Sequence, residues 1–353
     1  MNAGLFQGFA VTFLAGLVMG GNLLPIKWAR IWKWENFWLV YSLVGLLVVP
    51  VGLAFFLLPN LGSVYASLSP RAVTLPFLLG AGWGIAQLGS GVCVHRIGFA
   101  LTASILNGLC AASGTLVPLA LQHAEMLFQT TGLLILAGTA VMLVGVAFCG
   151  WAGARREETL RQQGSGAGFS SREAAMSQTA ISRAGYLATV ALAVISGFLA
   201  ALLNFALAFG GGIVQKVLAE GAKPVWAPFA VWPIALLGGL LVNVGYCLYL
   251  LFKNRTWGNF GGGVRELKNP VLAGCMWMGG IAIYSSGTTL LGILGVSVGW
   301  ALFQISLILC GNAAGLLTGE WRQMEARIQR VHIGGIVFLF LAIGMIAAAN
   351  YSR

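Results

Sequence analysis

The stretch Gly80–Gly98, GAGWGIAQLGSGVCVHRIG, decides between two fold classes. Its closely spaced glycines look like a dinucleotide-binding loop, which would require a parallel α/β fold. Such a loop follows a Val/Ile-rich strand and precedes an acidic residue about twenty positions later, and this chain has neither at those places. The stretch lies within a long apolar run, which indicates a helix in a membrane.

The composition of the whole chain agrees with a membrane protein. Of its 353 residues, 58% are hydrophobic and 8% are charged, whereas a soluble domain has about 25% charged residues. The chain contains no Asp, and its nine Glu lie between apolar runs or at their ends. Because a charge is costly in hydrocarbon, this placement predicts a polytopic membrane protein. The net charge of +11 then reflects membrane topology and not a nucleic-acid partner.

The sequence favours neither a metal site nor a catalytic site. The six Cys are scattered singly, with no CxxC pair and no His at metal-ligand spacing. A membrane-embedded enzyme needs a nucleophile beside a base, and the spans offer no such pair. We therefore expect a protein that is not an enzyme and that holds no cofactor or metal.

Apolar runs of about 20 residues, the length that crosses a bilayer as a helix, predict ten spans. They are residues 4–24, 37–58, 74–94, 98–120, 130–151, 185–209, 226–252, 270–291, 294–318 and 332–350. The first run lacks a basic segment and a small-residue cleavage site, so we expect a span and not a signal peptide.

The distribution of Lys and Arg predicts the orientation. Sixteen of the 20 lie in the loops after odd-numbered spans, and the other four are Arg71, Lys216, Lys223 and Arg353. Because cytoplasmic loops carry the excess of Lys and Arg, both termini are predicted to be periplasmic in a multi-pass protein of a bacterial inner membrane.

A polar segment divides the ten spans into two groups of five. Residues 152–184, rich in Ser, Gln, Gly and charge, are predicted to be a cytoplasmic linker between repeats 1–151 and 185–353. An odd number of helices in each half inverts the second half, so the predicted fold is all-α with two inverted five-helix repeats. Aligning Gly98 with Gly295 places Asn107 opposite Gln304.

Polar and aromatic residues recur in the middle of the spans. Trp83, Gln87 and Ser90 share one face of a helix, and a polar face at membrane depth must look toward protein or water. Further mid-span residues are Asn22, Ser104, Asn107, Asn204, Asn243, Tyr246, the run Tyr284, Ser285, Ser286, Gly287, Thr288, Thr289, then Gln304 and Asn312. Each alone could be a hydrogen bond between helices.

Together these side chains favour a neutral polyol as ligand. Amides and hydroxyls match sugar hydroxyls, and aromatic rings pack on the apolar face of a pyranose. The predicted sugar-binding residues are Trp83, Gln87, Ser90, Asn107, Asn204, Tyr284, Ser285 and Gln304, which we expect to line a central cavity. The glycines nearby, Gly80, Gly84 and Gly91, share a face and are interpreted as positions of close helix packing.

Several segments together resemble the L-rhamnose–proton symporter family of the drug/metabolite transporter superfamily. They are Pro25, Lys27, Trp32, Trp34, Glu35 and Trp38, then GAGWGI at 80–85, RIG at 96–98, SGTLV at 113–117 and GEW at 319–321. The resemblance implies proton-driven uptake of a 6-deoxyhexose, L-rhamnose or a related sugar, by alternating access between two inverted halves. The segment YSSGTTLLG from Tyr284 stands where bulky aromatic residues are expected in the family, and this leaves the sugar open.

Proton coupling has few candidate groups because the spans contain no central carboxylate. The candidates lie near span ends: Glu35, Glu320 and His95 on the predicted cytoplasmic side, and His123 and Glu125 on the other side. A structural alternative for the two carboxylates is pairing with Lys27, Arg30 or Arg322. The functional alternatives are a drug/metabolite-type exporter and an uncoupled facilitator of another small polar solute, although cationic drugs would favour an acidic cavity that this chain lacks.

Overall fold

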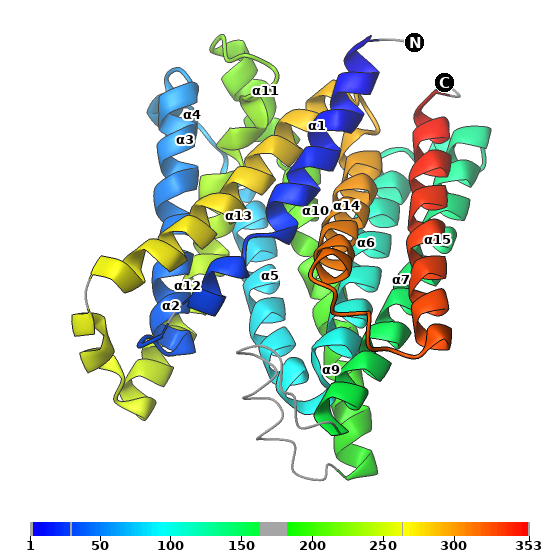
Figure 1. Ribbon diagram of the computed structural model, residues 1–353. Coiled ribbons are helices and arrows are strands. Elements are labelled where there is room, and N and C mark those ends of the chain that lie inside the picture. Colours follow the sequence, from blue (N-terminus) through cyan, green and yellow to red (C-terminus); the bar gives the residue numbers. More distant parts are fainter. Residues whose placement is uncertain (1–2, 29, 163–181, 263, 352–353) are drawn as a thin grey trace. The chain divides into compact units, whose positions relative to one another are not determined.

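The structure, a computed structural model, describes residues 3–28, 30–162, 182–262 and 264–351 (Figure 1). These residues form helices joined by short turns, with no β-strand in the described ranges. The helices of the first half are α1 Ala3–Gly20, η1 Leu24–Trp28, α2 Trp34–Leu43, η2 Val44–Val48, α3 Val49–Leu57, α4 Leu61–Ala66, α5 Pro70–Ile97, α6 Phe99–Gln122, η3 Ala124–Met126 and α7 Thr130–Gln162. Those of the second half are α9 Arg183–Ala200, α10 Leu202–Phe209, α11 Gly211–Ala219, η4 Ala227–Ala230, α12 Trp232–Asn254, η5 Trp257–Gly262, α13 Val264–Leu290, α14 Gly295–Leu317 and α15 Ala326–Tyr351.

The prediction of an all-helical, multi-pass membrane protein is confirmed. Within the described ranges, nine helical segments are long and apolar enough to cross a membrane. The eighth predicted span, 270–291, is not among the nine, although the 27-residue helix α13 covers most of it. Its polar run from Tyr284 and the charged residues near its start lower the apolar content of α13.

The chain divides into two compact units that do not follow chain order. Unit 1 comprises residues 1–85 and 202–299, and unit 2 comprises 86–201 and 300–353. In unit 1, α1 packs along α13, while α2 packs on α12 and α13. In unit 2, α7 packs along α15, and α6 packs on α7 and α9.

Close packing of α5 on α12 in unit 1 explains two of the three glycines on one face of α5. A Cβ on Gly80 would overlap the carbonyl oxygen of Ala235, and a Cβ on Gly84 would lie 3.0 Å from Cα of Gly239. The packing interpretation is confirmed at these positions. It is wrong for Gly91, where a Cβ would meet nothing within 4 Å.

Helix α7 in unit 2 continues beyond its predicted span, through Gln162. Ala152 is fully buried in a cluster with Trp321, Met324 and Ile328, and Leu160 packs against this cluster. These apolar contacts hold the first part of the predicted linker in a helix. Residues 163–181 of that linker lie outside the described ranges.

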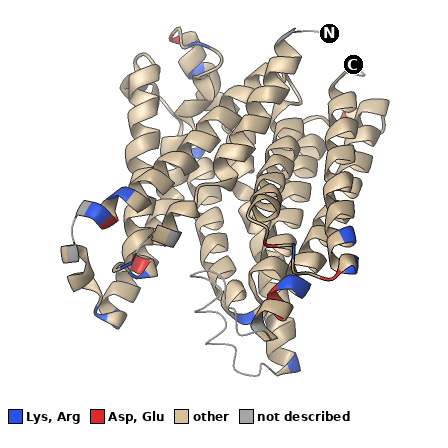
Figure 2. Ribbon diagram, in the orientation of Figure 1, with Lys and Arg blue, Asp and Glu red and all other residues tan. Residues whose placement is uncertain are grey.

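The charged residues lie mainly near the helix ends and in the connecting turns (Figure 2). Their scarcity in the middle of the long described helices agrees with the cost of placing a charge in hydrocarbon.

Candidate functional site

Two of the predicted sugar-binding residues meet inside unit 1. Tyr284 of α13 donates a hydrogen bond of 2.6 Å to Oδ1 of Asn204 on α10, and both side chains are fully buried. The hydroxyl oxygen of Tyr284 also lies 3.3 Å from the carbonyl oxygen of Val296. A phenol held between an amide and a carbonyl is a rigid, buried polar group.

Ser285, the next residue of α13, uses its hydroxyl within the protein. It donates to the carbonyl of Ile281 at 2.8 Å and accepts a 2.8 Å hydrogen bond from Nε1 of Trp232 on α12. Ser285 and Trp232 are fully buried. Ser285 therefore positions the indole of Trp232 between α12 and α13.

Trp83 of α5 packs against Trp277 of α13 within unit 1. The ring centroids are 5.3 Å apart and the ring planes are inclined by 34°. A Cβ on Gly239 would come within 2.8 Å of the Trp83 ring, so the missing side chain of this glycine makes room for the indole. Both indoles are buried.

The other four predicted sugar-binding residues belong to unit 2. Gln87 and Ser90 of α5 and Asn107 of α6 are half-buried, and the Ser90 hydroxyl donates to the backbone carbonyl of Gln87 at 2.7 Å. The half-exposed amides of Gln87 and Asn107 are suited to exchange hydrogen bonds with a ligand.

Gln304 of α14 is buried in unit 2 beside Trp300 and Cys110. Its Nε2 lies 3.3 Å from Sγ of Cys110, and the indole of Trp300 donates to the Cys110 carbonyl at 3.0 Å. A Cβ on Gly114 would overlap the Trp300 ring. This glycine therefore allows the indole to lie against α6.

A second aromatic and amide group in unit 1 was not among the predicted site residues. Trp38 donates from Nε1 to Oδ1 of Asn243 at 2.8 Å and stacks on Trp34 with centroids 5.1 Å apart. Tyr41 also contacts the Trp38 ring and lies 3.3 Å from Nδ2 of Asn22. The signal was present in the sequence, because residues 34, 38 and 41 have the spacing of one helix face.

The three proton-coupling candidates differ in their surroundings. The carboxylate of Glu35 is buried and accepts hydrogen bonds from Thr256 at 2.7 Å and Asn254 at 3.1 Å. Glu320 pairs with Arg156 of α7 at 2.5 Å, and His95 is exposed at the end of α5. Among the described side chains, neither carboxylate pairs with Arg30 or Arg322, and the side chain of Lys27 lies outside the described part of the chain.

The structure therefore assigns Trp83, Asn204, Tyr284 and Ser285 to unit 1 and Gln87, Ser90, Asn107 and Gln304 to unit 2. Within the units, it joins Tyr284 to Asn204 and Ser90 to Gln87 through hydrogen bonds.

A comparison with sequence models of known protein families identifies the family of this chain. The sequence model of the L-rhamnose-proton symport protein family matches residues 1–350. The chain belongs to this family. The resemblance found in the sequence is confirmed, and the family is one of transporters and not of enzymes.

Relatives in the family span nearly the whole chain. An L-rhamnose-proton symporter of Mannheimia succiniciproducens is 26% identical over 332 residues, which cover 91% of each chain. Those of Escherichia coli O1:K1 / APEC and Shigella dysenteriae serotype 1 are 25% identical over 331 and 336 residues, again with 91% of each chain covered.

Proposed function

We propose that this protein takes up L-rhamnose or a related 6-deoxyhexose together with a proton across the bacterial inner membrane. The observation that carries the proposal is the family match over residues 1–350. The neutral amides and aromatic rings found in both units support a sugar as substrate, because such groups pair with hydroxyls and pack on a pyranose ring.

The proposed sugar contacts are the eight residues predicted from the sequence. Gln87 and Asn107 are the strongest of these, since their amides are half-exposed. Trp83 and Gln304 offer an aromatic surface and a further amide. Tyr284, Asn204 and Ser285 are buried. Tyr284 is hydrogen-bonded to Asn204, and Ser285 is hydrogen-bonded to Trp232. Their proposed part is therefore to shape and orient the binding surface as the protein changes conformation.

Transport is proposed to proceed by alternating access in a ten-helix protein whose halves, 1–151 and 185–353, are inverted repeats. Helix α13 would be the tenth span in this arrangement. The excess of Lys and Arg in the loops after odd-numbered spans supports periplasmic termini and a cytoplasmic linker. A cysteine placed at Ser165 in a variant without the six native Cys should be inaccessible to an impermeant thiol reagent in intact cells whose outer membrane has been permeabilised. Labelling there would refute this orientation.

Proton coupling is proposed to use Glu35, Glu320 or His95. Burial favours the protonated form of a carboxyl group, and a conformational change that buries and hydrates such a group in turn could load and release a proton. Glu320 differs from Glu35 in having a cationic partner, Arg156 of α7. Movement of α7 could therefore make or break this ion pair.

The test is uptake of radiolabelled L-rhamnose into proteoliposomes that contain the purified full-length protein. Saturable uptake that rises with an inward proton gradient is expected. Saturable uptake that ignores the gradient would indicate an uncoupled facilitator, whereas absence of L-rhamnose uptake alongside transport of another solute would favour an exporter-like role.

A further inference from the structure

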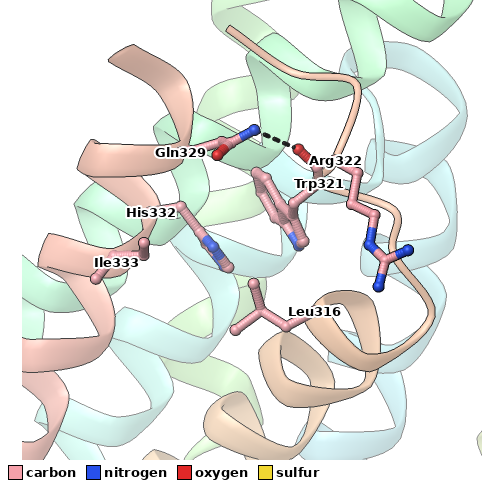
Figure 3. Close-up of a pocket in the computed structure, with 6 residues that line it drawn as sticks. All are labelled: Leu316, Trp321, Arg322, Gln329, His332 and Ile333. Atoms are coloured by element: carbon pink, nitrogen blue, oxygen red, sulfur yellow. Dashed lines mark hydrogen bonds between the residues drawn. The ribbon is translucent and has the colours of Figure 1, made fainter. Parts of the chain in front are cut away.

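His332 is a histidine of α15 that lies inside a membrane-spanning segment and is fully buried in unit 2. Its ring stacks on Trp321 with centroids 3.7 Å apart and planes inclined by 13°. Together with Arg322 and Gln329, these two residues border a cavity of about 140 Å³ that Leu316 and Ile333 complete (Figure 3). A buried titratable side chain near the start of such a segment is a candidate for function.

The hydrogen bonds of Asn312 fix which nitrogen of His332 carries hydrogen. Nδ2 of Asn312 donates to the carbonyl of Ile308 at 2.7 Å, so Oδ1 is the atom that faces His332, 2.6 Å from Nε2. An amide oxygen only accepts, so Nε2 must be the donor in this contact. In the neutral ring, Nδ1 then carries the lone pair, and it finds no hydrogen-bond partner among the described residues. His332 is thus oriented to receive a proton at Nδ1.

The charged groups around this ring come from two other elements. From α7, the guanidinium of Arg156 lies 5.4 Å from the centroid of the Trp321 ring. From the segment that follows α14, Glu320 pairs with Arg156, and Arg322 borders the cavity. The thiol of Cys149, also on α7, lies within 2.7 Å of the position that a Cβ on Gly335 would occupy, one turn along α15.

These neighbours make the ion pair sensitive to the charge on His332. While the ring is neutral, the carboxylate of Glu320 has Arg156 as its cationic partner. A proton at Nδ1 would create a second cation near Arg156. Two neighbouring cations repel each other unless a carboxylate neutralises the added charge. Glu320 precedes Trp321 in the chain, and Trp321 stacks on His332, so Glu320 is the nearest carboxylate in sequence to that contact.

We propose that His332 carries the coupled proton, with Glu320 shifting between Arg156 and the protonated imidazole. This inference rests on the proposed function, since it concerns the proton that accompanies the sugar. Of the three coupling candidates proposed above it retains Glu320, and it assigns the proton itself to His332. The Arg156–Glu320 pair links the end of α7 to the segment between α14 and α15. Protonation at Nδ1 loosens that link, and release of the proton restores it. The proton is bound and released without any covalent chemistry.

The experiment compares His332→Gln with the wild type in proteoliposomes, using two assays. Exchange of labelled L-rhamnose between equal concentrations tests sugar transport, and accumulation driven by an inward proton gradient tests coupling. A glutamine amide can donate to Asn312 but cannot titrate. The variant should retain exchange within about twofold and lose gradient-driven accumulation. Glu320→Gln should lower accumulation in the same way.

His123→Gln serves as the matched control, because His123 lies in the turn after α6 with its Nδ1 3.7 Å from Glu125. This variant should behave as the wild type in both assays. Normal accumulation by His332→Gln would overturn the inference but leave the proposed function intact. If the wild type itself fails to exchange L-rhamnose, the proposed function fails instead.

A second variant decides the matter if His332→Gln does not fold. Asn312→Asp places a carboxylate against Nε2 of His332, which favours the protonated ring. The pH midpoint of gradient-driven uptake should therefore move upward by about one unit. A purely structural histidine would leave the midpoint where it is in the wild type, and that result would also overturn the inference.

Discussion

Substitution of Gly80 by alanine tests the close approach of α5 and α12. The structure leaves no room for the added methyl group, because it would overlap the carbonyl oxygen of Ala235. At Gly84, one turn along the same face, a Cβ would lie 3.0 Å from Cα of Gly239. Carbon atoms in contact rest about 3.5–4.0 Å apart, so the two helices would have to separate by about 0.5–1 Å at Gly84 and by more at Gly80.

The expected cost follows from overpacking a tight interface. Added methyl groups in well-packed interiors cost about 1–3 kcal/mol, and the backbone overlap places Gly80→Ala at the upper end of that range. Gly91→Ala on the same helix is the matched control, since a Cβ there meets nothing within 4 Å. Alanine at that position gains about 1 kcal/mol of helix propensity over glycine.

Thermal unfolding of the purified protein in detergent, followed by fluorescence-detected size exclusion, measures the difference. The transition temperature should be highest for Gly91→Ala, lower for Gly84→Ala and lowest for Gly80→Ala. Equal transition temperatures for Gly80→Ala and Gly91→Ala would show that α5 does not approach α12 as described.

Two further predictions concern individual polar side chains. Gln87→Ala should weaken L-rhamnose binding by about 1–3 kcal/mol, because sugar hydroxyls would lose a partner; a titration in detergent measures this, with the exposed Gln129→Ala as control, and unchanged affinity would make Gln87 a packing residue. Ser285→Ala should destabilise the protein by about 1–3 kcal/mol by leaving the buried Trp232 N–H unpaired. The same change in a Trp232→Phe background should cost much less, and equal costs in both backgrounds would rule out the pairing.

The fold class could be predicted from the sequence because membrane helices leave strong signals. Apolar length, the absence of Asp and the placement of Glu are properties of the chain itself. The helix boundaries were less predictable where tertiary contacts extend a helix. Helix α7 runs through Gln162 because Ala152 and Leu160 pack near Trp321, and a contact across so many residues leaves no local pattern.

The candidate site was predicted in its residue types but not in its pairings. Tyr284 and Asn204 are 80 positions apart, and neither segment contains a sequence pattern that identifies the other as its partner. The glycines of α5 illustrate the same limit: helical spacing placed Gly80, Gly84 and Gly91 on one face, but only the path of α12 decides which of them it touches.

The sequence did not indicate the proposed role of His332 for a related reason. A single histidine at the start of an apolar span gives no periodic signal in the sequence, and it carries no charge while the ring is neutral. Asn312 was recognised as a mid-span polar residue, but its role as the partner of His332 depends on α14 and α15 lying together.

The most direct test of the account is to measure sugar and proton movement in the same vesicles. Proteoliposomes loaded with a pH-sensitive dye receive external L-rhamnose in the absence of any imposed gradient. Proton-coupled uptake predicts acidification of the lumen that depends on the protein and on L-rhamnose. Entry of labelled L-rhamnose without any change in luminal pH would contradict the account.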